Sequence, residues 1–247
     1  MIWIREDLRA LFEGLDLEGF LALGESVAKQ SPDGTRTTSR FERGGRAFYV
    51  KAHTGVGWGE LAKNWLQGKH AVVDAATEVR ALERCAERGV PAPRLAAHGT
   101  DGAAPAARRS FVVTEAIEPA ERLTERLERE AARPDAGARR RAWARALGLL
   151  VGELHAAGIA HRDLYLTHVL VREPDAAEPE LALIDLHRAL PADERLRVKD
   201  LAALLASARR AGATRADALR FLRAYGVPGD ERALARRVAR RAARVKA

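Results

Sequence analysis

The chain has 247 residues, 47% hydrophobic and 31% charged, a balance typical of water-soluble globular proteins. Its length allows one large domain or two smaller lobes. The longest apolar stretch, residues 146–160, is interrupted by Glu153 and His155 and is too short for a transmembrane helix. The N-terminus carries acids early and lacks a signal pattern, and the single Cys85 excludes an internal disulfide. We therefore expect a cytoplasmic protein.

The net charge of +8 is concentrated at one end of the chain. Residues 209–247 contain twelve Lys and Arg against three acids, so this segment carries +9 and the rest sums to −1. A basic module on a near-neutral body predicts an anionic partner, which would be a membrane surface, a phosphorylated glycolipid, an acidic protein or nucleic acid. A solvated basic helix face is the alternative.

The N-terminal half is predicted to be rich in strands. Residues 5–24 have the pattern of an amphipathic helix or helix pair. Residues 37–43 and 46–52 follow as two strands, and Gly44-Gly45 between them indicates a hairpin. On the second strand, Lys51 falls on the opposite pleat from Phe48 and Val50.

A helix and two further strands complete this half. The helix is expected over residues 74–89, with Asp74 capping its start and Gly89 ending it. Residues 94–98 and 110–115 have the composition of strands. Residues 116–119 would then form the crossing to a second lobe.

The C-terminal half is predicted to be mostly helical, over residues 121–132, 138–157, about 201–208, 214–225 and 230–246. Two short apolar runs, HVLVR and LALIDL, would form a hairpin with a loose connection. This order of elements predicts an α+β fold of two lobes, residues 1–117 and 118–247.

Residues 161–170, HRDLYLTHVL, reproduce the kinase catalytic-loop pattern H-R-D-L-x-x-x-N with His168 in the Asn position. In that pattern the Asp, here Asp163, accepts the proton of the attacking hydroxyl, and we expect Arg162 to brace the loop. His168 would either ligate a metal or hydrogen-bond the nucleotide, although magnesium prefers oxygen ligands. The alternative is an accidental match in a helix-to-strand turn.

Two further aspartates follow at kinase-like spacing. Asp185 lies 22 positions after Asp163, behind the apolar run LALI, where the pattern places the magnesium-binding Asp of D-F-G. Here the tripeptide is D-L-H, and His187 is larger than Gly and less permissive of unusual backbone conformations. Asp200 either accepts hydrogen bonds from the catalytic loop or is an ordinary acid at a helix start.

Lys51, in FYVKA, resembles the strand lysine of V-A-I-K that contacts the α- and β-phosphates. Its expected partner is Glu78, with Glu60 as a competitor, and an exposed strand lysine with surface glutamates is the alternative. No G-x-G-x-x-G precedes Lys51. The best substitute for a phosphate-covering loop is KQSPDGTRTTS, which contains Gly34.

Together these residues resemble the lipopolysaccharide kinase (Kdo/WaaP) family, from about Phe41 to Tyr225. The resemblance rests on FYVKAHTGVGWGELAKNWL, ERGVPAP, HRDLYLTHVLV, LIDLHRA and KDLAALLASA. It implies a bilobal protein-kinase-like fold that uses ATP and Mg²⁺ to phosphorylate a heptose of the lipopolysaccharide core at the cytoplasmic face of the inner membrane. It implies Asp163 as catalytic residue, Lys51 and Glu78 as the nucleotide-positioning pair, and Asp185 as metal ligand.

The spacing after Asp185 also favours a sugar acceptor. Only 15 positions separate Asp185 from Asp200 and no A-P-E occurs, whereas protein kinases use a longer segment there to dock a polypeptide. The basic C-terminal region fits an acceptor with phosphates and acidic sugars on an anionic inner-membrane surface.

Three alternatives remain open. One is a kinase of another small hydroxyl compound, such as Kdo or an aminoglycoside. Another is a membrane-associated pseudokinase, suggested by His168, His187 and the missing glycine loop. Nucleic-acid binding is disfavoured, because aromatic residues make up 5% of the chain and none lie among the arginines after Gly226. The sequence leaves the oligomeric state open.

Overall fold

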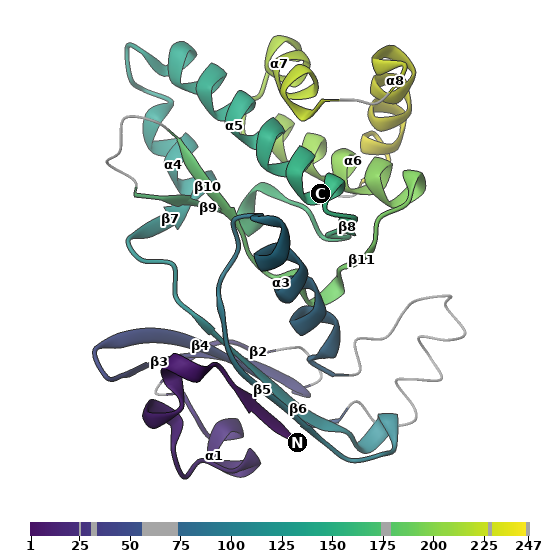
Figure 1. Ribbon diagram of the computed structural model, residues 1–247. Helices are drawn as coiled ribbons and strands as arrows, with labels where there is room; N and C mark the ends of the chain where they lie inside the picture. Colours follow the sequence, from purple (N-terminus) through teal and green to yellow (C-terminus); the bar gives the residue numbers. More distant parts are fainter. Residues whose placement is uncertain (25, 31–33, 56–73, 174–178, 227–228, 246–247) are drawn as a thin grey trace. The chain divides into compact units, whose positions relative to one another are not determined.

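The computed structural model describes residues 1–24, 26–30, 34–55, 74–173, 179–226 and 229–245 (Figure 1). The chain divides into two compact units. Residues 1–83 and 93–116 form the N-terminal unit, and residues 84–92 and 117–247 form the C-terminal unit. The assignment of residues 1–117 to nucleotide binding and of residues 118–247 to catalysis stays a prediction.

The N-terminal unit is built on an antiparallel sheet whose six described strands run in the order β1-β5-β6-β4-β3-β2. The hairpin expected at Gly44-Gly45 is present, with φ of 58° and 70° at the two glycines. Glycine has no Cβ atom and adopts such angles at no steric cost. The strands are β1 Ile2–Ile4, β2 Ser26–Gln30, β3 Arg36–Arg43, β4 Arg46–His53, β5 Leu95–Asp101 and β6 Arg109–Glu115.

The helix or helix pair expected over residues 5–24 is wrong in extent. The structure has strand β1, two 3₁₀ turns at Glu6–Leu8 and Ala10–Phe12, and one short helix α1, Leu17–Leu21. Gly14 has φ of 78°, which no α-helix accommodates, so the apolar residues on either side belong to separate turns.

The apolar residues of these turns build the core on one face of the sheet. Phe12 and Phe20 are fully buried with Phe48 and Phe111, and the rings of Phe20 and Phe111 stack with centroids 4.2 Å apart. Stacked and edge-to-face ring pairs add about 0.5–1.5 kcal/mol each beyond the burial of their area. The alternation predicted for β4 is therefore confirmed, because Phe48 and Val50 both point into this core.

Helix α3, Ala76–Arg88, matches the expected helix over residues 74–89. The Asp74 carboxylate accepts a hydrogen bond from the Ala76 amide at 3.0 Å, and Gly89 ends the helix with φ of 69°. These are the capping roles expected of an Asp and a Gly at helix ends.

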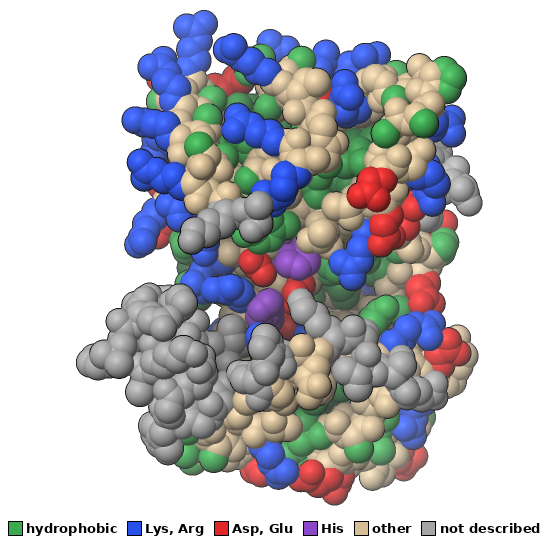
Figure 2. Space-filling model, turned by 180° about the vertical axis from the view of Figure 1, so that it is seen from behind, with side chains coloured by type: hydrophobic (Ala, Val, Ile, Leu, Met, Phe, Trp, Pro, Cys, Tyr) green, Lys and Arg blue, Asp and Glu red, His purple; other side chains and the backbone are tan. Residues whose placement is uncertain are grey.

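The C-terminal unit consists mainly of helices, on whose surface Lys and Arg side chains crowd (Figure 2). The predicted hairpin is present as β9 and β10, and the unexpected strand β7 pairs with β9. No helix in the described segments is long and apolar enough to span a bilayer. The elements are α4 Leu123–Glu130, α5 Ala136–Ala156, α6 Glu194–Arg210, α7 Arg215–Tyr225, α8 Glu231–Ala242, β7 Ala120–Arg122, β8 Ile159–Ala160, β9 Val169–Arg172, β10 Glu180–Leu183 and β11 Leu190–Pro191.

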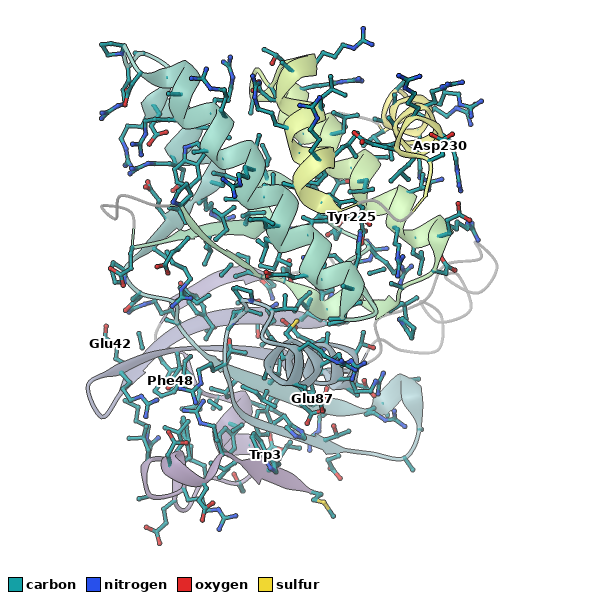
Figure 3. All side chains as sticks on the ribbon, turned by 45° about the horizontal axis from the view of Figure 1, so that its top comes forward. Trp3, Glu42, Phe48, Glu87, Tyr225 and Asp230 are labelled. Atoms are coloured by element: carbon teal, nitrogen blue, oxygen red, sulfur yellow. The ribbon has the colours of Figure 1, made fainter. Side chains whose placement is uncertain are left out.

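Two glycines let α7 approach α5 closely, at the end of α7 where Tyr225 lies (Figure 3). A Cβ at Gly148 would collide with the carbonyl oxygen of Phe221, and a Cβ at Gly152 would lie 2.7 Å from that of Tyr225. Real Cβ atoms do not come so near a backbone oxygen, so the helix pair requires glycine at both positions.

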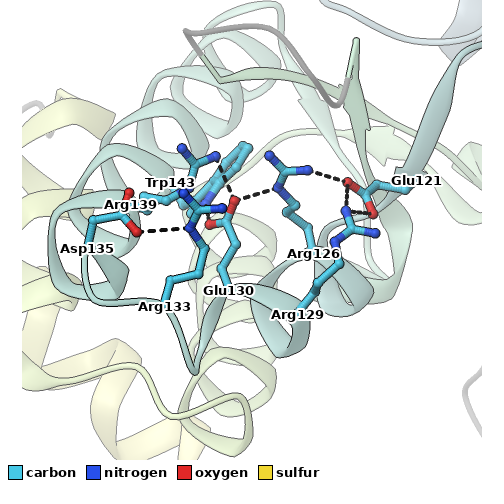
Figure 4. A network of polar contacts seen from close by, with 8 residues as sticks. All are labelled: Glu121, Arg126, Arg129, Glu130, Arg133, Asp135, Arg139 and Trp143. Carbon is cyan, nitrogen blue, oxygen red and sulfur yellow. Dashed lines mark hydrogen bonds and ion pairs between the residues drawn. The ribbon is translucent and has the colours of Figure 1, made fainter.

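A polar network joins the end of α4 to the start of α5 (Figure 4). The buried Glu130 carboxylate accepts a hydrogen bond from Trp143 Nε1 at 2.7 Å and forms ion pairs with Arg126 and Arg139 at 2.5 and 2.6 Å. Burial alone would raise the pKa of Glu130, but these three donors hold it below its ordinary value. The charged form of Glu130 therefore stabilises the folded chain.

We expect Gly148→Ala to destabilise the fold by about 1–3 kcal/mol, because the new methyl group overpacks the α5–α7 contact. Gly137→Ala, in the first turn of α5, is the matched control. Its Cβ would meet nothing nearer than the flexible end of Arg141 at 3.7 Å, and alanine is the better helix former. Chemical denaturation measures both. An equal loss in the two variants would contradict the packing argument.

We expect Glu130→Gln to lower the free energy of unfolding at pH 7 by about 2–4 kcal/mol, because Arg139 loses its carboxylate partner and Arg126 keeps only its ion pair with Glu121. A carboxylate with a depressed folded-state pKa stabilises above its unfolded pKa, and this stabilisation is lost as pH falls. Between pH 7 and pH 3, the free energy of unfolding should therefore fall less steeply in the variant than in the wild type. Glu87→Gln, at an exposed pair with Arg84, should leave both the stability and its pH dependence unchanged.

Candidate active site

The predicted catalytic loop lies between β8 and β9 in the C-terminal unit, and Asp200 of α6 holds its backbone. Asp200 is fully buried, and its two carboxylate oxygens accept hydrogen bonds from the amides of His161 and Arg162, each at 2.7 Å. Of the two readings of Asp200 from the sequence, the structure shows the loop-binding one. Arg162 adopts φ of 66°, a strained angle for a residue with a side chain, and the hydrogen bonds from the two backbone amides hold it there.

A buried relay extends from Asp200 to α7. His155 Nε2 lies 3.3 Å from Asp200, and His155 Nδ1 lies 2.8 Å from the Tyr225 hydroxyl. Because Asp200 only accepts, Nε2 carries the proton and Nδ1 accepts from the tyrosine. The sequence analysis missed this relay. Its signal was a histidine that interrupts an apolar run, where a polar side chain needs a buried partner.

His161 forms the floor of the loop. Its ring is fully buried, donates from Nε2 to the Ile184 carbonyl at 3.0 Å and stacks on the His168 ring at 5.8 Å between centroids. Burial lowers the pKa of His161, so the ring is neutral near pH 7.

His168 connects Asp163 to Asp185. Its Nδ1 lies 2.7 Å from the Asp163 carbonyl oxygen, and its Nε2 lies 3.6 Å from an Asp185 carboxylate oxygen. A carbonyl only accepts, so Nδ1 is the donor, and Nε2 is the ring atom that faces the carboxylate. Nε2 and the carboxylate oxygen could hold a proton or a metal cation between them.

Asp185 lies two residues after the end of strand β10 and has left-handed backbone angles, φ 67° and ψ 49°. His187 Nδ1 lies 2.7 Å from its other carboxylate oxygen, and Leu186 between them is buried, as expected for a packing residue in the place of Phe. Non-glycine residues in this conformation cost about 1–3 kcal/mol and cluster at functional sites. In the described part of the chain, only Arg162, Glu173 and Asp185 have it.

The Asp163 side chain differs from these in having no partner. Within the described segments, its partly buried carboxylate forms no hydrogen bond or ion pair, while its carbonyl accepts from His168 and Tyr165. The loop thus fixes the backbone and leaves the carboxylate able to accept a proton.

The donor set around Asp185 fits magnesium. Magnesium is usually held by one or two carboxylates together with substrate phosphates, so the described residues need not form a closed metal cage, and they contain none. Two donors on one magnesium ion lie about 3–4 Å apart, and the Asp185–His168 separation of 3.6 Å falls in this range. Asp185 is the oxygen donor, and His168 is a less favoured nitrogen donor.

Lys51 and Glu78 form the second predicted constellation, in the N-terminal unit. Lys51 Nζ lies 2.6 Å from Glu78 Oε1, and Glu78 is 4% exposed. The other carboxylate oxygen of Glu78 has no hydrogen-bond partner among the described residues. The competitor Glu60 lies outside the described residues, as do residues 31–33 of the proposed phosphate-covering loop, while Gly34 has φ of 70°.

We expect Asp200→Asn to destabilise the fold by about 1–3 kcal/mol, because an amide group would then face a buried amide of the loop. Tyr225→Phe removes only the outermost hydrogen bond of the relay and should cost less, about 0.5–1.5 kcal/mol. Thermal or chemical unfolding of the two variants gives the order. A larger loss in Tyr225→Phe would show that Asp200 is not the central group.

Comparisons with known proteins agree with this geometry. The family described as "Lipopolysaccharide kinase (Kdo/WaaP) family" matches residues 22–225. The lipopolysaccharide core heptose(I) kinase WaaP of Pseudomonas aeruginosa is 41% identical over 90% of this chain and 85% of its own length. The protein of that name from Escherichia coli is 33% identical over 91% of this chain and 87% of its own length.

A solved structure, described as WaaP in complex with acyl carrier protein, has a TM-score of 0.79 and 33% identity. The match covers 99% of this chain and 98% of the solved chain. The α+β, protein-kinase-like fold expected from the sequence is confirmed. The chain belongs to the lipopolysaccharide kinase (Kdo/WaaP) family.

Proposed function

We propose that this chain transfers the γ-phosphoryl group of ATP to a hydroxyl of a heptose in the lipopolysaccharide inner core. The observation that carries the proposal is the loop in which Asp163 keeps an unpartnered carboxylate while His168 links its backbone to Asp185. The relatives named as heptose(I) kinases support heptose as the acceptor.

In this proposal Asp163 accepts the proton of the heptose hydroxyl and orients its oxygen toward the phosphorus. Arg162 supports the loop through the hydrogen bond from its guanidinium to the Arg188 carbonyl at 3.3 Å. A general base positioned in this way typically contributes a factor of about 10²–10⁴ to the rate.

Lys51 would neutralise charge on the α- and β-phosphates, and Glu78 would hold its ammonium in place. Asp185 would hold the magnesium ion, with His168 contacting either the ion or the nucleotide. A bound magnesium ion neutralises the charge that develops on the transferred phosphoryl group. His168 in an asparagine position, and His187 after Asp185, are the residues that would support a pseudokinase.

The acceptor is proposed to be a glycolipid rather than a protein. Strand β11 follows Asp185 closely and pairs with β8, and α6 begins at Glu194, so the described chain has no long segment there for docking a polypeptide. A kinase of Kdo or of an aminoglycoside-like compound is the runner-up, because the same loop would activate any small hydroxyl compound.

We also propose partners for the basic surface. Helices α7 and α8 carry most of the positive charge of the C-terminal segment and would bind the anionic cytoplasmic face of the inner membrane, where a peripheral enzyme meets its acceptor. Acyl carrier protein is a further proposed partner, supported by the complex in which the related WaaP structure was solved. The oligomeric state stays open.

We expect Asp163→Asn to reduce transfer to purified core glycolipid by about 10²–10⁴-fold, because asparagine cannot accept the hydroxyl proton. ATP affinity should stay within about twofold, since Asp163 is assigned to the acceptor. Labelled ATP measures the transfer. Asp101→Asn, at the exposed end of β5, is the control and should retain full activity.

The same assay separates the alternatives. A panel of core glycolipid, Kdo and aminoglycosides identifies the acceptor, and mass spectrometry of the product locates the phosphate. Thermal unfolding should show greater stabilisation by ATP with Mg²⁺ than by ATP alone, since ligands that bind the folded state raise its apparent stability. Absence of that difference would favour the pseudokinase, and full activity of Asp163→Asn would contradict the assigned base.

A further inference from the structure

A cavity of about 570 Å³ lies between α6 and α8 in the C-terminal unit. Val198 of α6 and Val245, just after α8, supply its apolar lining. The rest of the lining is cationic and consists of Arg237, Arg240, Arg241 and Arg244. This volume falls within the range of small-molecule sites, about 300–1,000 Å³.

The cavity arginines occupy a defined side of α8. At about 100° per residue, Val238 and Ala242 form the buried stripe that packs on α6, and Arg237 and Arg241 flank it. Arg232 and Arg236 lie on the opposite flank of this stripe and do not line the cavity. The arginines of this segment thus divide into a set on the cavity flank and a set on the other flank.

The described residues leave most of the charge in the cavity unpaired. Arg237 forms an ion pair with Glu194, but Arg240, Arg241 and Arg244 have no carboxylate partner in the described part of the chain. Cations near a helix C-terminus are stabilised by its dipole, which helps to hold them there. The dipole is equivalent to only about half a charge and cannot balance three guanidinium groups.

Cationic groups also connect the cavity side of α8 to the catalytic loop. Burial lowers the pKa of the Lys199 ammonium, and the guanidinium groups of Arg162, Arg188 and Arg241 lower it further, while the Asp200 carboxylate raises it. Positive charge thus predominates around Lys199. A bound anion would reduce the repulsion that remains.

We propose that the cavity binds a phosphate or carboxylate group of the acceptor glycolipid. This inference rests on the proposed function and names the part of the acceptor that is recognised. Guanidinium groups suit the role, because each can donate two parallel hydrogen bonds to a phosphate or a carboxylate.

A discrete anionic group fits the observations better than a protein surface does. Protein interfaces bury about 800 Å² on each partner and are usually flat, whereas these arginines surround a hollow between two helices.

The test compares Arg240→Gln/Arg241→Gln with Arg232→Gln/Arg236→Gln, which removes the same charge from the other flank of the same helix. The acceptor is deacylated core oligosaccharide, so that no bilayer is present. We expect the cavity variant to raise KM for this acceptor at least tenfold with kcat within about twofold, and the control to change neither. With oligosaccharide from which phosphates have been removed and carboxylates reduced, the variant and the wild type should have the same KM.

Binding measured without ATP separates this inference from the proposed function. Thermal shift with the anionic oligosaccharide, and with inorganic phosphate at matched ionic strength, should show stabilisation of the wild type and the control but not of the cavity variant. If no acceptor is phosphorylated, the proposed function fails. The binding result alone then decides whether the cavity binds the anionic group.

Two outcomes would overturn the assignment. If the cavity variant keeps its KM and oligosaccharide binding but no longer binds vesicles containing phosphatidylglycerol, the arginines contact lipid headgroups. If it loses only the binding of acyl carrier protein, they form a protein-docking surface.

Discussion

The buried carboxylate of Asp200 is the interaction on which the catalytic loop depends. Its two oxygens accept hydrogen bonds from the backbone amides of two consecutive loop residues, His161 and Arg162. Arg162 adopts a left-handed conformation in this arrangement. His155 and Tyr225 fix the carboxylate from behind, and Gly148 and Gly152 let the helix carrying Tyr225 come close enough to do so. Packing far from the chemistry thus determines the direction in which the loop presents its side chains.

The strain and unbalanced charge in this unit have one explanation. Arg162 and Asp185 hold unfavourable backbone angles, His168 Nε2 faces the Asp185 carboxylate, and three arginines of the α6–α8 cavity have no carboxylate partner among the described residues. In our proposals, a bound metal ion or anion would offset these costs. A protein selected for ligand binding keeps such arrangements, because stability is required only above a threshold.

Local patterns predicted most of the fold, and tertiary contacts account for the rest. The β3–β4 hairpin and α3 were predictable because Gly44-Gly45, Asp74 and Gly89 act within a few residues. Strands β1 and β7 were missed, because three residues show no periodicity. The pairing of Lys51 with Glu78 followed from a known pattern, whereas His155 and Tyr225 lie 70 positions apart and only the fold brings them together.

The pairing of β8 with β11 has a consequence for inhibition. Leu190 and Pro191 pair with the two residues that lead into the catalytic loop, so the segment after Asp185 is fastened at both ends within a few residues. A compound that acts by moving Asp185 outward would have to break this strand pairing. Compounds that leave the segment in place are therefore the better starting points.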